Sequence, residues 1–171
     1  ERYYNNTEAD TPKKNVKYFV DNISPTFGKA IDIGCGAGND SVYLIKNGWS
    51  VVSIDKENVG ERISKRLDAE EQKRFKFQQQ NFNDMKLEKV DLIVANYSLP
   101  FCNNEKINDV WRNIVNSIRT NGYFVGNFFG IKDSWNKAES NMTFFTKEQV
   151  QNLFDELLER IKTIRVSERM A

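Results

Sequence analysis

The 171 residues contain no histidine, the side chain most often used as a general base and the commonest zinc ligand. Only two cysteines occur, Cys35 and Cys102, in unrelated contexts. This pattern predicts no disulfide framework and indicates a reducing, cytoplasmic compartment. No apolar run approaches the ~18 residues of a membrane span, and the first residues lack the pattern of a signal peptide. Neither a metal site nor a membrane partner is expected.

An excess of one charge sign is also missing. The chain has 25 Lys and Arg residues against 24 Asp and Glu residues, a formal net charge of +1. Surfaces that bind nucleic acid normally carry a basic excess, so a nucleic-acid partner is not expected. The basic residues between Lys65 and Lys76 are interpreted as a solvated face. With 39% hydrophobic residues, the chain has the composition of one globular domain over residues 1–171.

Strand-like and helical patterns of hydrophobic residues alternate along the chain. Strands are expected over residues 29–35, 50–55, 75–81, 90–98, 123–130 and 162–168. Helices are expected over residues 12–23, 39–47, 59–67, 107–118 and 147–158. This alternation predicts an α/β fold, a single Rossmann-like, doubly wound and mostly parallel sheet with helices on both faces.

Local signals set some of these boundaries. Thr11 followed by Pro12 is typical of a helix start, with the hydroxyl as N-cap. Thr146 and Gln149 form a predicted capping box ahead of the last helix. Asn121–Gly122 is expected to be a turn that leads into the fifth strand.

The stretch KAIDIGCGAGND, residues 29–40, places three glycines at alternate positions after a short apolar run. Glycines at the first turn of such a sheet let a ligand approach the backbone closely. A dinucleotide fingerprint needs its third glycine at position 39, where Asn39 stands, and no Walker A lysine follows. The spacing therefore weakens both phosphate-binding interpretations.

Two carboxylates flank this turn. Asp32, just before it, would repel a pyrophosphate but attract a cationic ligand group, so a ligand with an ammonium and a sulfonium suits it. Alternatively, Asp32 only bonds the N–H groups of the turn. Asp55, at the end of the second expected strand, is placed to accept hydrogen bonds from ribose hydroxyls. Dinucleotides and S-adenosylmethionine both have a ribose, so Asp55 supports nucleoside binding without deciding between them.

A longer series of motifs resembles the class I S-adenosylmethionine-dependent methyltransferases. AIDIGCGAGNDSVYL and VVSID resemble the first two motifs of that family, and DLIVANYSLPFC resembles its fourth-strand motif. GYFVGNFFGIKDSW and MTFFTKEQV resemble a small bacterial branch, the tellurite-resistance-type methyltransferases. YYNNTEADTPKKNV resembles the N-terminal helix of that branch, which covers the cofactor. Residues 1–23 are therefore expected to form a helix and lid segment.

The resemblance implies S-adenosylmethionine as the cofactor and assigns its contacts by position. The expected cofactor-binding residues are Asp32, Gly34, Cys35, Gly36, Gly38, Asp55, Lys56, Asn81, Phe82, Asn96 and Tyr97. Asn81 stands where many members carry an aspartate, and its oxygen still accepts a hydrogen bond from the adenine amine. The candidate residues on the acceptor side are Tyr4, Tyr97, Phe101 and Trp135. No catalytic base is assigned.

One departure from the family pattern concerns the last strand. The family sheet ends with an antiparallel strand that pairs with the sixth, but only Arg169, Met170 and Ala171 follow Glu168 here. Either that strand is missing or truncated, or the sheet has six strands. An unpaired sheet edge favours association, so a homodimer is one expected assembly.

These observations predict an enzyme that moves a methyl group from S-adenosylmethionine to a small-molecule acceptor by in-line displacement. The lack of histidine fits an acceptor that is already a soft anion and needs no general base. Two alternatives stay open. One is a non-catalytic S-adenosylmethionine-binding module, and the other, disfavoured by the glycine spacing, is an NAD-dependent oxidoreductase. The identity of the acceptor is not predicted.

Overall fold

The computed structural model describes residues 11–137, 141–158 and 161–166. Its centre is a six-stranded sheet in the order β3-β2-β1-β4-β5-β6, in which neighbouring strands are parallel. The strands are β1 (Lys29–Ile33), β2 (Ser50–Asp55), β3 (Phe75–Gln79), β4 (Val90–Ala95), β5 (Ile118–Gly126) and β6 (Ile161–Val166). The strand order reverses between β1 and β4. The carboxyl ends of these two strands therefore form the switch point at which such sheets bind ligands.

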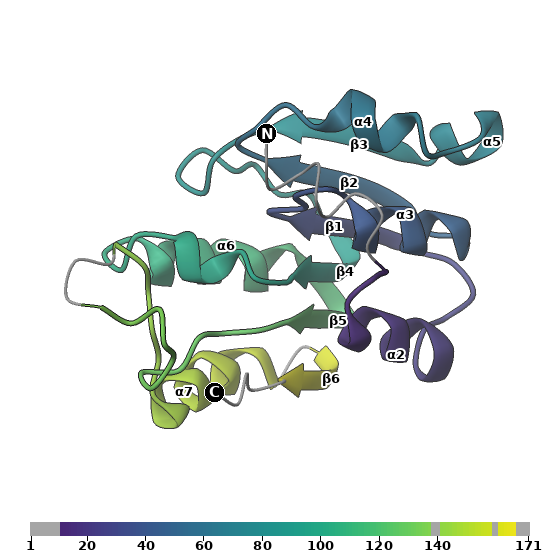
Figure 1. Cartoon of the computed structure of the whole chain (residues 1–171). Helices are drawn as coiled ribbons and strands as arrows, with labels where there is room; N and C mark the ends of the chain where they lie inside the picture. The colour runs from purple at the N-terminus through teal and green to yellow at the C-terminus, as the bar shows by residue number, and fades with distance from the viewer. Residues whose placement is uncertain (1–10, 138–140, 159–160, 167–171) are drawn as a thin grey trace.

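Helices connect the strands and cover both faces of the sheet (Figure 1). They are α2 (Lys14–Asn22), α3 (Asn39–Lys46), α4 (Gly60–Ser64), α5 (Ala69–Gln72), α6 (Ile107–Ser117) and α7 (Lys147–Leu158), with a 3-10 helix η1 (Leu99–Phe101). α2 and α3 lie on one face, and α6 and α7 lie on the other. The predicted α/β fold is confirmed. In the described ranges, no helix is long and apolar enough to cross a bilayer.

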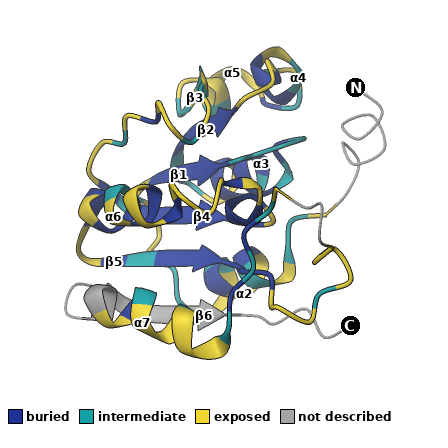
Figure 2. Ribbon diagram, turned by 90° about the vertical axis from the view of Figure 1, so that its left-hand side faces the viewer, coloured by how far each residue is buried: buried dark blue, intermediate teal, exposed yellow. Residues whose placement is uncertain are grey.

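Alternate residues of the central strands pack into two separate cores. In β4, Leu92 belongs to the α2-side core, which surrounds Trp49, and Ile93 belongs to the α6-side core, which surrounds Trp111. Both tryptophans are fully buried. Figure 2 shows that β1, β2 and β4 are buried almost throughout, as expected for parallel strands covered on both faces.

The predicted start of the first helix is wrong. α2 begins at Lys14, and Thr11 and Pro12 stay outside it. The backbone N–H of Lys13 donates to Asp40 Oδ1 at 2.7 Å, and Lys13 is extended. A contact with a distant residue therefore sets this boundary, and the local capping signal does not.

The helix predicted over residues 59–67 is shorter in the structure, where α4 ends at Ser64, and the short helix α5 that follows it is not among the predicted elements. Asp68 starts this second helix. Its carboxylate accepts the N–H groups of Glu70 and Glu71, and the Glu71 side chain accepts the Asp68 N–H in return. This capping box is visible in the sequence and explains the break.

The turn predicted at Asn121–Gly122 lies inside a strand and not before it. β5 begins at Ile118 and runs through both residues, and its ladder with β4 changes register between Val90 and Leu92. Asn121 has a φ of 63°, so the turn residues produce an irregularity inside the strand. The ladder with β4 pairs Ile118 and resumes at Tyr123, and the ladder with β6 starts at Gly122, so the turn residues form a bulge between paired stretches of β5.

The C-terminal elements follow the prediction more closely. In the capping box before α7, the Thr146 N–H donates to Gln149 Oε1 at 2.8 Å and the Gln149 N–H donates to Thr146 Oγ1 at 3.1 Å. The strand predicted over residues 162–168 is β6, which pairs in parallel with β5. Within the described part of the chain, the sheet thus has six strands and no antiparallel one.

Candidate functional site

The glycine turn, residues 34–38, joins β1 to α3 at the switch point. Gly34, Gly36 and Gly38 have φ angles of 67°, 55° and 75°, in the left-handed region that other residues rarely adopt. A Cβ at Gly34 would lie 2.4 Å from Ser98 Cβ, so the turn also packs against the segment that follows β4. The glycines are required for this shape, and they place no side chain between the backbone of the turn and a ligand.

Cys35 lies within the turn. Its N–H and that of Gly34 both donate to the Ile54 carbonyl, at 3.0 and 2.8 Å. Burial raises the pKa of the Cys35 thiol well above its usual value, and the nearby carboxylates of Asp32 and Asp55 raise it further. Because the thiolate and not the thiol is the nucleophile, Cys35 is suited to lining a ligand and not to attacking it.

Asp55 ends β2 beside the turn. Its carboxylate accepts the N–H of Gly36 at 2.8 Å and the N–H of Glu57 at 3.0 Å. A carboxylate has about four lone-pair positions, so it can hold the turn and accept ligand hydroxyls at the same time. Lys56, the next residue, is exposed. As a hydrogen-bond acceptor, the Asp55 carboxylate therefore fits a ligand that carries ribose hydroxyls.

Asp32 lies below the turn, between β1 and α3. Its Oδ2 accepts the hydroxyl of Ser41 at 2.6 Å, and Ser41 Oγ in turn lies 2.6 Å from Ser53 Oγ. Asp32 is only 2% exposed. Burial, together with the charge of Asp40, raises the pKa of Asp32 to about 8. Protein groups thus surround Asp32, and its contact with a ligand ammonium stays a prediction.

A polar network links the start of α2 to the segment after β4. Asn96 and Asn15 exchange hydrogen bonds between their side-chain amides, at 2.7 and 3.1 Å. Asn96 Nδ2 also donates to Asp40 Oδ2 at 2.9 Å, and the other Asp40 oxygen accepts the N–H of Lys13. We call these four residues the Asn96 network. Burial raises the pKa of Asp40 above its usual value.

Three of the four residues predicted for the acceptor side come together around Phe129. The ring centres of Tyr97 and Trp135 lie 6.0 and 5.8 Å from that of Phe129, and Phe101 lies 6.3 Å from Trp135. We call these four aromatic residues the aromatic rim, which follows the ends of β4 and β5. Tyr4 lies outside the described residues. Phe129 is not among the predicted residues, because the sequence places it inside the strand expected over residues 123–130, whereas β5 ends at Gly126.

Tyr97 has a backbone conformation that is rare for a residue with a side chain, with a φ of 53°. Its N–H donates to Asn127 Oδ1 at 2.7 Å, which stabilises this conformation. The Lys13 ammonium lies 5.3 Å from the centre of the Tyr97 ring, within the range of a cation–π contact. Backbone strain of this kind is concentrated at functional sites.

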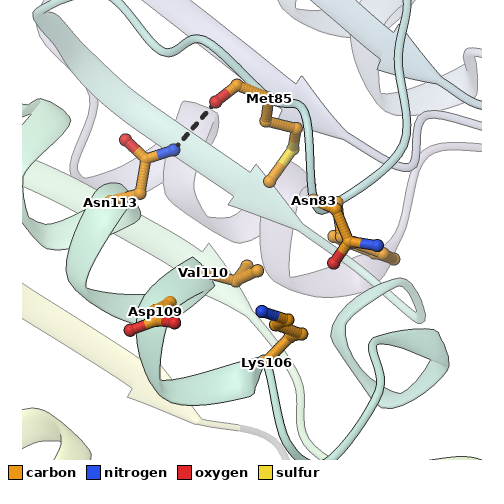
Figure 3. A pocket seen from close by; sticks show the side chains of 7 residues that line it. Asn83, Met85, Lys106, Asp109, Val110 and Asn113 are labelled. Atoms are coloured by element: carbon orange, nitrogen blue, oxygen red, sulfur yellow. Dashed lines mark hydrogen bonds between the residues drawn. The ribbon is translucent and has the colours of Figure 1, made fainter.

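Asn81 and Phe82, the predicted adenine contacts, follow β3. Asn81 Oδ1 accepts the N–H of Asn83 at 3.0 Å, so one of its two acceptor positions is in use. Phe82 lines a cavity of about 150 Å³ beside α6, shown in Figure 3. The other lining residues are Asn83, Met85, Lys106, Asp109, Val110 and Asn113. Small-molecule sites usually exceed ~300 Å³, so this cavity does not hold a whole nucleoside cofactor.

Known proteins share this sequence pattern and this fold. The family model described as tellurite resistance protein TehB matches residues 1–131. TehB from Haemophilus influenzae is similar in structure, with a TM-score of 0.68 and 20% sequence identity, over 90% of this chain and 53% of that chain. A chain of the Haloferax volcanii complex that contains the Trm112 methyltransferase activator has a TM-score of 0.72 and 14% identity, over 90% and 70%.

A third similar structure is the 1,6-didemethyltoxoflavin-N1-methyltransferase of Burkholderia thailandensis, solved with 1,6-didemethyltoxoflavin and S-adenosylhomocysteine. It has a TM-score of 0.67 and 18% identity, over 91% of this chain and 72% of that chain. At these identities the likeness shows the fold. The chain spans about half the length of the Haemophilus TehB chain. No curated protein matches it in sequence.

Proposed function

Since the chain belongs to the TehB family of tellurite resistance proteins, we propose that it is an S-adenosylmethionine-dependent methyltransferase that acts on a small-molecule acceptor. The observation that carries this proposal is the hydrogen bond from the glycine turn to Asp55, 2.8 Å long, at the switch point. This bond supports the proposal because it holds the Asp55 carboxylate, a group that can accept ribose hydroxyls, beside a backbone that a ligand can approach closely. Asn39 at the position of the third fingerprint glycine disfavours NAD.

The proposed cofactor contacts are those that the resemblance to the family motifs implies. When bound, the cofactor supplies a methyl group on a sulfonium, which is electrophilic without further activation. The proposed contacts are Asp32, Gly34, Cys35, Gly36 and Gly38 for the methionyl part, Asp55 and Lys56 for the ribose, Asn81 and Phe82 for the adenine, and Asn96 and Tyr97 beside the methyl group.

The contribution of the chain to such a transfer is alignment. The acceptor must meet the methyl group in line with the departing sulfur, in a site from which water is largely excluded. The aromatic rim provides apolar walls for this purpose, and Asn127 fixes the position of one of them by holding the Tyr97 backbone. Lys13 adds a positive charge beside the Tyr97 ring. These groups position and shield an acceptor.

The same groups favour a soft anionic acceptor. An ammonium attracts an anion, and aromatic side chains contact polarisable atoms favourably. Neither an ammonium nor an aromatic ring takes up a proton from an acceptor. A thiolate, a selenide or a similar anion is already deprotonated and needs no general base, which agrees with the lack of histidine in the sequence.

We also propose that the 171 residues act as one domain in a reducing, bacterial cytoplasm, because Cys35 and Cys102 are both free thiols. Among the residues that the structure describes, β3 and β6 are the edge strands of the sheet. An unpaired edge can add a strand from another chain, so a homodimer is the assembly to test, by sedimentation of the purified protein.

Thermal unfolding with added ligand tests the cofactor. A ligand at about 100 times its Kd stabilises a protein by roughly 2.7 kcal/mol, which raises the midpoint of a domain of this size by roughly 5–10 °C. S-adenosylhomocysteine should produce this shift and NAD should not. Asp55→Ala should lose most of the shift. Asp91→Ala is the matched control, because Asp91 bonds Lys29 and Arg119 at the opposite end of the sheet.

The possible outcomes separate the candidate functions. A rise in the thermal midpoint with NAD but not with S-adenosylhomocysteine would mean that the glycine turn binds a dinucleotide. An equal shift with S-adenosylhomocysteine in the wild type and in Asp55→Ala would mean that Asp55 does not contribute to binding this ligand. Binding of S-adenosylhomocysteine without methyl transfer to any thiol or chalcogen acceptor would favour the non-catalytic binding module.

A further inference from the structure

Ser98, the residue after Tyr97, has a buried hydroxyl without a partner. Ser98 is 4% exposed, and within the described part of the chain its Oγ makes no hydrogen bond. Buried hydroxyls are nearly always hydrogen-bonded, and an unpaired one is costly. An alanine at this position would avoid that cost. The presence of a serine therefore points to a hydrogen-bond partner that is not one of the surrounding protein groups, such as a ligand.

The Ser98 hydroxyl is placed to cap a helix but makes no capping hydrogen bond. Ser98 is the N-cap of η1, a position at which a serine hydroxyl usually accepts a backbone N–H of the first turn. Here no such side-chain bond forms, although the Ser98 carbonyl accepts the Phe101 N–H at 2.9 Å. The strained φ of Tyr97, stabilised by Asn127, sets the direction in which the chain enters this segment.

The Ser98 side chain lies against the glycine turn instead. A Cβ built on Gly34 would come within 2.4 Å of Ser98 Cβ and 3.3 Å of Ser98 Oγ. The hydroxyl therefore lies at the first residue of the turn, where the missing side chain of Gly34 leaves the space that Ser98 uses.

The sheet order indicates which part of a ligand reaches this point. β1 lies between β2 and β4, so the glycine turn has Asp55 of β2 on one side and Ser98, after β4, on the other. On the premise of the proposed function, a cofactor whose ribose lies at Asp55 extends its other end toward Ser98. We propose that Ser98 Oγ binds the amino-acid end of the cofactor, donating to its carboxylate or accepting from its ammonium.

Isothermal titration calorimetry with two ligands tests this assignment. S-adenosylhomocysteine carries the amino-acid end, and 5′-methylthioadenosine lacks it but keeps the thioadenosine part. Ser98→Ala should weaken the binding of S-adenosylhomocysteine about tenfold, a typical effect of losing one hydrogen bond to a charged group. It should leave the binding of 5′-methylthioadenosine unchanged.

Ser117→Ala is the matched control. Ser117 is buried to the same extent, 4% exposed, but its hydroxyl donates to the Asn113 carbonyl at 2.8 Å within α6. This variant should bind both ligands as the wild type does. In the ligand-free protein it should lower the thermal midpoint, because a bonded hydroxyl is lost. Ser98→Ala should leave that midpoint unchanged or raise it, because the hydroxyl that it removes is unpaired.

Three results would overturn the assignment. One is equal affinity of wild type and Ser98→Ala for S-adenosylhomocysteine. Another is an equal loss of affinity for both ligands, which indicates an indirect effect on the turn. The third is a fall in the ligand-free midpoint as large as that of Ser117→Ala, which means that the hydroxyl already has a partner. If the wild type binds neither ligand, the proposed function itself fails, and this result is distinct from the other three.

Discussion

At the glycine turn, the absence of a Cβ atom at Gly34 and at Gly38 allows close packing that another residue would prevent. A Cβ at Gly38 would come within 2.5 Å of Ile63 Cδ1, a fully buried atom group of the α2-side core. Gly38 is the N-cap of α3, a position usually held by a capping side chain, but its left-handed conformation and the packing of Ile63 select glycine. The turn is thus fixed by the core beneath it as well as by its own backbone preferences.

Gly38→Ala should lower the free energy of unfolding by about 1–3 kcal/mol, because the new methyl group both strains the backbone and displaces Ile63. Urea denaturation of the ligand-free protein measures this change. Gly130→Ala is the control, since no heavy atom lies within 4 Å of a Cβ built there. It should stay within about 0.5 kcal/mol of the wild type. Equal stability of both variants would show that the turn relaxes to accept a side chain.

At the scale of elements, α2 is held by tertiary contacts. The side chain of its N-cap residue, Lys13, makes no capping hydrogen bond. Its Val16 and Phe19 are buried in the α2-side core, and Asn15 joins it to Asn96 at the end of β4. A nine-residue helix is marginal without such packing. The position of α2 beside the candidate site therefore depends on the Asn96 network.

Asn15→Ala should loosen α2 without unfolding the sheet. Losing the paired amide bonds should cost roughly 1 kcal/mol, about a fivefold increase in local opening. Hydrogen exchange of the Phe19 and Val20 amides measures this opening. The control is Asn22→Ala, because Asn22 Nδ2 donates within the helix, to the Tyr18 carbonyl at 3.0 Å. Identical exchange in the two variants would contradict a role for the Asn96 network in holding α2.

The elements that sequence predicts well are those whose signals are local. Hydrophobic periodicity gives the order of strands and helices, and the capping box at Thr146 gives the start of α7. The Asn121–Gly122 signal marks an irregularity within β5, but it does not show that the strand already begins at Ile118. Asn15 and Asn96 are 81 positions apart, and no pattern along the chain indicates that their amides meet.

The residues of the candidate site also divide into those that local sequence motifs predict and those that only the folded chain reveals. The glycines and Asp55 belong to motifs with fixed spacing, so their neighbouring positions could be predicted. Ser98, Asn127 and Phe129 depend on contacts between separate segments that only the folded chain defines.

At the scale of the whole molecule, buried acids couple folding to pH. Asp32, Asp40 and Asp55 come together where β1, β2 and α3 meet, and burial raises the pKa of Asp32 to about 8 and that of Asp40 above its usual value. An aspartate in an unfolded chain has a pKa of about 3.9. Between these values the folded protein keeps a proton that the unfolded chain has lost. The free energy of unfolding therefore falls as the pH rises through this window.

Asp32→Asn should reduce this pH dependence. The amide resembles the neutral carboxyl group, so the variant should lose less stability than the wild type between pH 5 and pH 8. One such group contributes at most about 1.4 kcal/mol per pH unit. Denaturation midpoints of the ligand-free protein at several pH values measure the slope. Asp91→Asn, at the other end of the sheet, should keep the wild-type slope. A wild-type slope in Asp32→Asn would mean that Asp32 is ionised in the folded protein.

The two cores and the aromatic rim each contain one of the three tryptophans of the chain. Trp49 and Trp111 are 0% and 1% exposed, whereas Trp135 is 46% exposed. Indole fluorescence depends on solvent contact, so these side chains emit from three different environments. Variants that keep a single tryptophan, with phenylalanine at the other two positions, would each report on one region. The native sequence thus supplies separate optical probes for the two faces of the sheet and for the aromatic rim.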